Sequence, residues 1–332
     1  MQQLSKRTAG FTDSVIRRMT RISNQYQAVN LSQGFPDFDP PKEILDRLAQ
    51  TAHEDFHQYS ITWGAQNFRE ALAVKQSALM GKEIDPNGEI VVTCGSTEAM
   101  MAAMLTVTNP GDKVIVFSCG KVFTRDELGY IAELAKKYDT YVITDEVYEH
   151  IVYEPHQHIY FASLPGMWER TISCSSLSKT YSITGWRLGY IIAPPEIIDV
   201  AKKVHDFLTV GAAAPLQEAV IPGLRFGRSY YDELREKYTR KKNLFLKGLD
   251  EIGLVHTNPE GAYYVLLDIS EFSYESDLTF CEALAEKVRV GAVPGSSFFR
   301  EPVNHLIRLH FAKKDETLYE ALNRLESIRK KM

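Results

Sequence analysis

Short apolar runs and amphipathic segments alternate along residues 43–192. Apolar residues recur at helical spacing in 43–56 and in 67–79, and a third helix is predicted over 124–138, where Thr124 and Glu127 have the spacing of a capping box. The short apolar runs between them are bounded by turn residues, which predicts buried strands. These predicted strands begin at Ile90, Lys113, Tyr141, Arg170 and Arg187.

Strands that alternate with helices indicate an α/β fold with a mostly parallel sheet and right-handed crossovers. The pattern changes after Pro215, where a long helix over 226–253 precedes a strand, a helix, a strand and a helix. This second pattern is typical of an α+β arrangement, so we expect a second domain at the C-terminal end.

Ligands of such sheets bind at the carboxyl ends of the strands. That rule selects the turn at 95–97, Asp145 and the segment 176–179. Lys179 follows a buried strand among hydroxyl side chains, and Arg187 lies eight residues further on, where a guanidinium can bind a phosphate through two hydrogen bonds. Asp145 ends an apolar strand, and a buried carboxylate requires a partner.

Plain structural roles are available for each of these residues: Lys179 as a solvated loop residue, Asp145 as a helix cap or as half of a buried salt bridge. Taken together they fit one cofactor. Pyridoxal phosphate requires a lysine for the imine, a carboxylate that keeps the pyridine nitrogen protonated, and a cradle for the phosphate.

Composition narrows the class of protein. The 332 residues are 44% hydrophobic and 24% charged, with a net charge of -5, which excludes a disordered chain and disfavours nucleic acid as the main partner. The four cysteines form no C-x-x-C pair, and no apolar run approaches the roughly 20 residues of a membrane span. The first twenty residues lack the apolar stretch of a secretion signal, so we expect a cytoplasmic enzyme.

Seven motifs in a fixed order carry a family resemblance. Asp145–Tyr148 (DEVY) and Ser176–Gly189 (SLSKTYSITGWRLG) resemble the fold type I pyridoxal-phosphate aminotransferases of class I/II. The GFPDF form within 31–41 is similar to the kynurenine–oxoglutarate, glutamine and methionine aminotransferase branch. Further motifs are QYSITWG (58–64), VTCGSTEAM (92–100), VPGSSFF (293–299) and IRLHF (307–311).

The resemblance implies a large pyridoxal-phosphate domain over 41–225 with a mostly parallel sheet of the seven-stranded type. It also implies a small α+β domain over 226–332, which the N-terminal segment 1–40 joins. It further implies a homodimer with shared active sites that acts on amino acids and 2-oxo acids.

Site roles follow from the same resemblance. Lys179 would be the Schiff-base lysine and general base, Asp145 would pair with the pyridinium nitrogen, and Tyr148 would hydrogen-bond the 3-oxygen of the ring. The phosphate would be held by Ser96, Thr97, Ser176 and Arg187, and by Tyr59 of the neighbouring subunit. The substrate would meet Gly34, Phe35 and, through its α-carboxylate, Arg308.

One motif points elsewhere. Residues 53–57 fit the H-E-x-x-H pattern of zinc metalloproteases, in which both histidines share a helix face. The predicted helix ends near His57 in acidic surroundings and no third ligand is evident, so we expect a solvated face and no metal site.

The chain departs from the family at the junction of Ser118 and Cys119. There the predicted strand 113–117 runs directly into what resembles the tail of a later turn, and roughly fifty residues are absent, a little less than two βαβ units of about 30 residues each. The aromatic residue that stacks on the cofactor and the asparagine that contacts its 3-oxygen have no counterpart. Three interpretations stay open: the printed sequence omits a segment, the protein carries an impairing deletion, or it is rearranged and active.

The function predicted is amino-group transfer between an aromatic, kynurenine, glutamine or methionine-like amino acid and a 2-oxo acid. Two alternatives stay open: a cysteine-conjugate carbon–sulfur β-lyase that uses the same residues, and a catalytically impaired homologue that lacks part of the cofactor site.

Overall fold

The computed structural model describes residues 13–116, 121–301 and 303–332, and within these ranges the chain forms two compact units. The first comprises 13–37 and 238–332, and the second comprises 38–116 and 121–237. Ser118 and Cys119, the predicted junction, lie outside the described residues.

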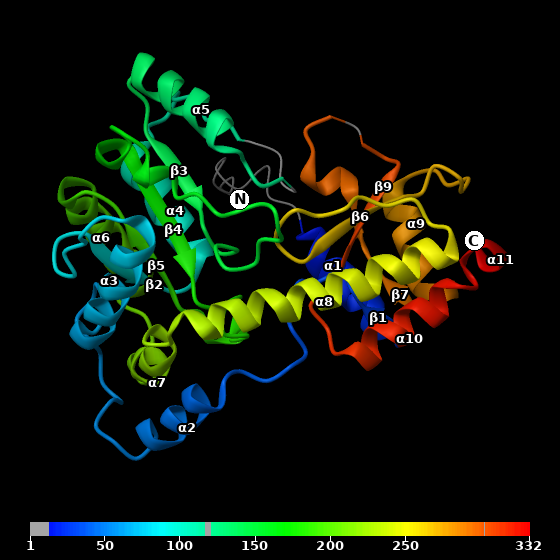
Figure 1. The fold of residues 1–332 in the computed structure, drawn as a ribbon, viewed down its shortest axis with the longest axis horizontal. Coiled ribbons are helices and arrows are strands. Elements are labelled where there is room, and N and C mark those ends of the chain that lie inside the picture. Colours follow the sequence, from blue (N-terminus) through cyan, green and yellow to red (C-terminus); the bar gives the residue numbers. More distant parts are fainter. Residues whose placement is uncertain (1–12, 117–120, 302) are drawn as a thin grey trace, which may run out of the picture. The chain divides into compact units, whose positions relative to one another are not determined.

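A four-stranded sheet forms the centre of the second unit, with the strand order β2-β5-β4-β3 (Figure 1). Its strands are β2 (Ile90–Thr93), β3 (Val142–Asp145), β4 (Thr171–Ser176) and β5 (Gly189–Ile192). β3 and β4 are parallel, whereas β5 runs antiparallel to β4 and β2. The predicted α/β class is confirmed, although this sheet has four strands within the described residues and the resemblance implied the seven-stranded type.

Helices cover both faces of this sheet because its strands are apolar on both sides. Val92 packs with Phe68 in one core cluster, while Val91 packs with Ala99 and Ala102 in another. The alternation follows from the two-residue period of a strand. The helices of this unit are α2 (Lys42–Thr51), α3 (Gln66–Met80), α4 (Ser96–Val107), α5 (Arg125–Lys137), α6 (Pro195–Thr209) and α7 (Ala214–Leu224).

The start of α5 follows directly from its sequence. The Thr124 hydroxyl accepts a hydrogen bond from the Glu127 backbone N–H at 3.3 Å, and the Glu127 carboxylate accepts one from the Thr124 N–H at 2.9 Å. The predicted capping box is therefore confirmed.

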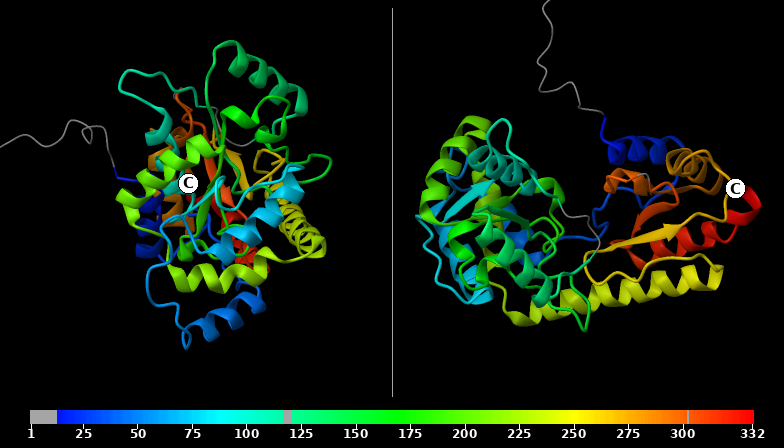
Figure 2. Two further views of the ribbon diagram at one scale, coloured as in Figure 1. Left: turned by 90° about the vertical axis from the view of Figure 1, so that its left-hand side faces the viewer. Right: turned by 90° about the horizontal axis from the view of Figure 1, so that it is seen from above.

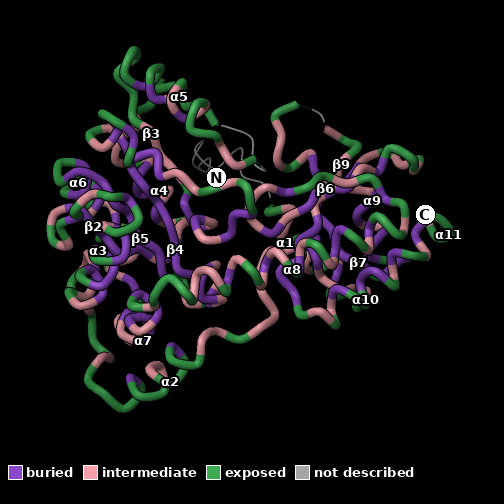
Figure 3. The backbone as a smooth tube through the Cα atoms, viewed as in Figure 1, coloured by how far each residue is buried: buried purple, intermediate pink, exposed green. Residues whose placement is uncertain are grey.

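The prediction of a buried strand over 113–117 is wrong for residues 113–116, and Phe117 lies outside the described residues. Val114, Ile115 and Val116 belong to no strand and are 52%, 83% and 84% exposed. An apolar pattern forms a strand only where another strand supplies hydrogen-bond partners. Among the described residues β3 is the last strand on its side of the sheet, so no such partner adjoins it there. Strands β2, β4 and β5 are buried throughout, whereas β3 is intermediate to exposed, and Figure 3 shows much of α5 exposed.

The helix predicted over 43–56 also ends early, because α2 stops at Thr51. His53 and His57 follow it in turn and irregular backbone, so they do not share a helix face as the H-E-x-x-H pattern requires.

The first unit contains a three-stranded antiparallel sheet in the order β6-β9-β8 and a parallel pair of β1 and β7 (Figure 2). The strands are β1 (Val29–Asn30), β6 (Tyr264–Asp268), β7 (Val290–Gly291), β8 (Val293–Pro294) and β9 (Leu306–His310). Its helices are α1 (Val15–Gln25), α9 (Asp277–Ala283), α10 (Asp315–Leu325) and α11 (Ile328–Lys331), and the chain enters it along α8 (Arg228–Ile252). Within the described ranges, no helix has the length and the apolar character that crossing a membrane requires.

Candidate active site

The predicted cofactor-binding segments meet at one edge of the four-stranded sheet. Gly189, where β5 begins, pairs with Ser176 at the end of β4 and with Thr93 at the end of β2. Asp145, at the end of β3, pairs with Cys174 of β4. The carboxyl ends of β2, β4 and β3 therefore lie at the same edge of the sheet, which brings together turns that are up to about eighty residues apart in the sequence.

An anion-binding arrangement lies at the end of β2. Gly95 has φ +85°, a conformation that favours glycine, and α4 begins directly after it at Ser96. The Arg187 side chain rests on this turn, because a β-carbon on Gly95 would lie 2.2 Å from its Nη2. Arg187 Nη1 donates to the Thr184 carbonyl at 2.9 Å, and among the described residues no carboxylate forms an ion pair with Arg187. The arginine and the helix start thus offer positive charge and N–H donors to the same small volume.

Two serines stand beside this arrangement at the end of β4. The Ser176 and Ser178 hydroxyl oxygens are 2.5 Å apart, and both residues are buried. Ser176 pairs with Gly189, whose strand adjoins the Gly95 turn, so the hydroxyl lies within the same edge of the sheet. The phosphate of a cofactor fits here, because Arg187 is a cation and the helix start and the two serine hydroxyls offer hydrogen-bond donors.

The residues predicted to contact the cofactor ring lie on the next strand. Asp145 is exposed on one side, yet burial of its carboxyl raises the pKa above the ordinary value, an effect that the Val147 N–H and Lys179 oppose. Lys179 Nζ lies 6.0 Å from the centre of the Tyr148 ring. A protonated ring nitrogen would favour the ionised form of Asp145, so these three side chains fit a pyridinium ring as well as the serines and Arg187 fit its phosphate.

A buried polar cluster supports the segment that carries Tyr148. The next residue, Glu149, is buried and forms an ion pair with Lys75 at 3.1 Å, and its carboxylate accepts hydrogen bonds from Gln76 and from Tyr160 at 2.6 Å. Tyr190 of β5 accepts a hydrogen bond from Gln76 at 2.6 Å. This cluster ties α3 to the end of β3 and so restricts the turn on which Tyr148 stands.

The three predicted substrate residues belong to the first unit, where Tyr264 connects two of them. The Arg308 guanidinium carbon lies 4.1 Å from the centre of the Tyr264 ring and 3.8 Å from that of Phe298. A β-carbon on Gly34 would lie 2.1 Å from the Tyr264 hydroxyl, and the Gly34 carbonyl accepts a hydrogen bond from Tyr263 at 2.8 Å.

Two aromatic rings therefore contact the Arg308 guanidinium, whose planar set of N–H donors suits a two-pronged contact with a carboxylate. Phe35 stands beside this group with its ring centre 4.0 Å from Lys313 Nζ, and burial lowers the pKa of that lysine.

Tyr59 is placed differently from the other predicted residues, because it is 87% exposed. In a single chain its side chain projects into solvent, as a group that serves a neighbouring subunit would.

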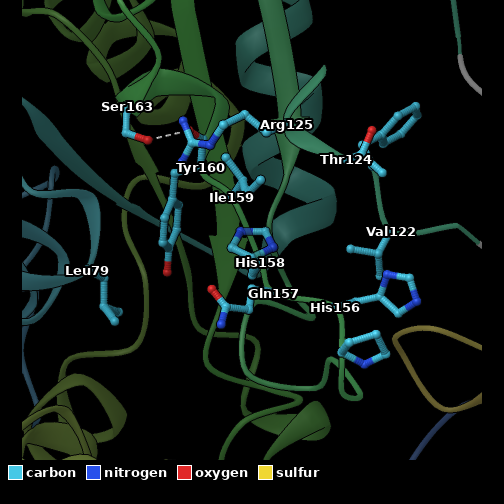
Figure 4. A pocket seen from close by; sticks show the side chains of 12 residues that line it. Leu79, Val122, Thr124, Arg125, His156, Gln157, His158, Ile159, Tyr160 and Ser163 are labelled. Carbon is cyan, nitrogen blue, oxygen red and sulfur yellow. Dashed lines mark hydrogen bonds between the residues drawn. The ribbon is translucent and has the colours of Figure 1, made fainter. Parts of the chain in front are cut away.

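A pocket of about 440 Å³ lies elsewhere in the second unit and contains none of the predicted site residues (Figure 4). Its lining comes from the first turn of α5, from 122–124 and from the segment 155–163. Nothing in its lining resembles the lysine, carboxylate and phosphate-binding set.

Sequence reasoning did not select Tyr264, Glu98 or His205. Tyr264 occupies an ordinary strand position, so no local signal marks it. His205 had a signal: it lies on the face of α6 that also carries Ile198 and Ala201, and a polar residue on an apolar helix face requires a buried partner.

Comparison with known proteins gives one family. The model for aminotransferase class I and II matches residues 26–119 and 118–325. The methionine aminotransferase of Escherichia coli is 34% identical over 369 residues, which covers 95% of this chain and 96% of the relative. Kynurenine–oxoglutarate transaminase 1 of Homo sapiens is 29% identical and covers 90% of this chain and 92% of the relative.

Solved structures agree. The crystal structure of Escherichia coli YbdL, described as having a methionine aminotransferase function, has a TM-score of 0.91 at 31% identity and covers 98% of this chain and 100% of that chain. N-succinyldiaminopimelate aminotransferase of Mycobacterium tuberculosis has a TM-score of 0.92 at 30% identity, with the same coverage. The relatives named here are aminotransferases, so the β-lyase alternative is not favoured.

These matches also bear on the short length of the chain. The two segments matched by the family model adjoin at the predicted junction. The alignment with the Escherichia coli enzyme runs over 369 positions, while 95% of this chain is only about 315 residues. About fifty positions of that relative therefore have no counterpart here, in agreement with the shortfall expected from the motifs.

Proposed function

Since this chain belongs to the aminotransferase class I and II family, we propose that it moves an amino group between an amino acid and a 2-oxo acid with bound pyridoxal 5'-phosphate. The predicted family and enzyme class are confirmed by the family model and the named relatives. The observation that carries the proposal is the meeting of Lys179, Asp145 and Arg187 at one edge of the sheet.

Each residue would contribute one function. When bound, the cofactor supplies an electron sink for the bonding electrons of the substrate Cα. Lys179 Nζ would hold the cofactor covalently and, as the general base, would take up and return the proton of the substrate Cα. Asp145 would hold a proton on the ring nitrogen, and Tyr148 would donate to the 3-oxygen.

The phosphate would bind to the backbone N–H groups of Ser96 and Thr97, to the Ser176 hydroxyl and to Arg187. Arg308 would bind the α-carboxylate, with Gly34 and Phe35 beside the substrate. The aromatic surfaces of Phe35 and Tyr264 favour a large apolar, aromatic or thioether side chain on the amino donor, as in methionine or kynurenine.

We propose a homodimer in which Tyr59 reaches the phosphate of the partner subunit. The 87% exposure of Tyr59 supports it, and so does the exposed apolar group of Phe207, Leu208 and Val210, because contiguous apolar patches mark interaction surfaces. Light scattering coupled to size exclusion tests the dimer. The domain division at 41 and 226 and the cytoplasmic location are further proposals, which limited proteolysis and cell fractionation test.

The direct test is covalent capture of the cofactor. Protein incubated with pyridoxal phosphate and reduced with borohydride should carry the cofactor mass on the peptide that contains Lys179, and Lys179→Ala should lose both this mass and the activity. We expect the activity loss to be at least about 100-fold, since a general base is removed. A wild-type protein that takes up no cofactor would establish the alternative of a catalytically impaired homologue.

The amino donor is tested with the same preparation. Methionine, kynurenine, glutamine and phenylalanine are each supplied with a 2-oxo acid, and the new amino acid is measured. Release of a thiol and pyruvate from a cysteine conjugate, without a new amino acid, would instead show the β-lyase reaction.

A further inference from the structure

His205 is a fully buried histidine whose two ring nitrogens both face acceptors. Nδ1 lies 3.1 Å from each carboxylate oxygen of Glu98, and Nε2 lies 3.1 Å from the carbonyl oxygen of Thr62. Carbonyl and carboxylate oxygens accept hydrogen bonds, so each of these contacts is one that a ring N–H of His205 can make. The histidine therefore makes one contact on each side, to two different segments.

The Glu98 contact leads to the phosphate-binding turn. Glu98 lies in the first turn of α4, and its Oε2 accepts a hydrogen bond from the Cys94 backbone N–H at 3.0 Å. Cys94 directly precedes Gly95 and Ser96, where the N–H groups of the helix start are exposed to a ligand. The Glu98 carboxylate thus binds the first N–H of the 94–97 turn, and the contact with His205 holds this carboxylate in position.

The Thr62 contact leads to residues 59–63, which we call the Tyr59 segment. This segment is also held at Trp63, whose carbonyl accepts from Val92 N–H at 3.0 Å, and at Ser60, whose hydroxyl accepts from the buried Gln217 amide at 3.0 Å. Tyr59 itself projects from these anchored positions, so its placement depends on how firmly they are held.

We propose that His205 is a positioning residue that fixes two phosphate-binding groups at once: the 94–97 turn of its own active site and the Tyr59 segment that serves the partner's site. The inference rests on the proposed function, because that function makes both segments ligands of the cofactor phosphate. It predicts that loss of His205 weakens binding of the phosphate group and leaves binding of the pyridine ring unchanged.

Two substitutions separate the contacts of the histidine. The amide nitrogen of His205→Asn takes the place of Nδ1 and keeps the donor to Glu98, whereas that of His205→Gln takes the place of Nε2 and keeps the donor to Thr62. Thr106→Val is the matched control, because the Thr106 hydroxyl lies on α4 like Glu98 but donates to the Ala102 carbonyl of the same helix, at 2.7 Å.

Each variant is titrated with pyridoxal 5'-phosphate and, separately, with pyridoxal, which lacks the phosphate. We expect both His205 variants to raise the Kd for pyridoxal 5'-phosphate about tenfold, the equivalent of about 1.4 kcal/mol, and to leave the Kd for pyridoxal unchanged. The ratio of the two constants is measured within one variant, so a general loss of stability affects both and cancels. Thr106→Val should keep the wild-type ratio.

A double-mutant cycle with Tyr59→Phe tests the second contact. His205→Asn acts through the Tyr59 segment alone, so its effect should not add to that of Tyr59→Phe, whereas the effect of His205→Gln should add. Unchanged ratios in both His205 variants, or an equal loss for pyridoxal, would overturn the proposal. A wild type that binds neither compound would overturn the proposed function itself, which is a different outcome from normal binding with an unchanged ratio.

Discussion

Gly189 approaches Gly95 so closely that a β-carbon on Gly189 would lie 2.5 Å from the Gly95 carbonyl carbon and 2.7 Å from the Ser96 nitrogen. The contact is between two backbones, so neither side can rotate away. It sets the distance between the start of β5, which follows Arg187, and the turn that begins α4.

Gly189→Ala should therefore push the phosphate-binding turn out of place. We expect a loss of about 1–3 kcal/mol in the free energy of unfolding, as for other overpacked sites, together with a higher Kd for pyridoxal phosphate. Gly129→Ala is the control, because its β-carbon would meet nothing within 4 Å inside α5, and it should stabilise the protein by up to about 1 kcal/mol. Urea unfolding and cofactor titration of both variants check this.

Cofactor affinity should depend on pH through Asp145. Burial raises the pKa of this carboxyl in the free protein, against the effect of the Val147 N–H and Lys179, while a protonated ring nitrogen requires the ionised carboxylate. Affinity for pyridoxal phosphate should thus fall as the pH drops through the raised pKa, and Asp145→Asn should be weaker throughout and lack that step. If the affinity of Asp145→Asn falls with pH by the same amount, the pH dependence belongs to another group.

The buried pair of Lys75 and Glu149 should respond to acid in a recognisable way. Burial acts to raise the pKa of Glu149, but Lys75 and His150 outweigh it and hold the pKa well below its ordinary value. A depressed pKa stabilises the folded state above the unfolded pKa of about 4.3, and this contribution is lost as the pH falls through the folded pKa.

Lys75→Met should cost about 3–5 kcal/mol at neutral pH, because it leaves an unpaired buried carboxylate. As Glu149 takes up a proton in acid, the difference in the free energy of unfolding between this variant and the wild type should become smaller. Lys247→Met, in an exposed pair with Glu251 at 3.7 Å, should change stability by less than about 1 kcal/mol at any pH. Urea unfolding across a pH series measures both.

The pair of His158 and Glu146 should show the opposite dependence of stability on pH. Burial acts to lower the pKa of His158, but Glu146, 2.8 Å away, raises it above the ordinary value. The pair therefore stabilises the fold below the unfolded pKa of about 6.5, and the contribution is lost as the pH rises through the folded pKa. Melting temperatures of His158→Gln should lack this decline, and a decline that persists in the variant would place its origin elsewhere.

The exposed apolar segment before the junction should promote self-association. Ile115 and Val116 are more than four-fifths exposed, and the outer edge of β3 has no neighbouring strand among the described residues. Free strands and free edges pair with one another. Ile115→Lys combined with Val116→Lys should reduce species larger than a dimer in light scattering while the melting temperature stays within experimental error, whereas unchanged scattering would show that this segment is not involved.

Local rules predicted those elements that depend on neighbouring residues alone. The capping box at Thr124 is an example, since both of its hydrogen bonds join residues three positions apart. The strand expected over 113–116 failed for the same reason in reverse: an apolar run describes half of a strand pair, and the sequence does not state whether the other half is present.

The sequence by itself determined the chemistry that this protein can carry and its family. Lysine, carboxylate and arginine define what a site can bind, and their order along the chain identified the aminotransferase class I and II family before any contact was known. The shortfall of about fifty residues at the junction of 118 and 119 could likewise be inferred from the order of the motifs alone.

Only the tertiary structure decided which groups hold the site in place. Gly189 against Gly95, Lys75 with Glu149 and His205 with Glu98 are contacts between residues 74 to 107 positions apart. Such contacts depend on which strands are neighbours in the sheet and on which helix covers which face. No local pattern encodes these arrangements, because each partner alone is an ordinary glycine, an ordinary lysine or an ordinary histidine until the fold brings the other to it.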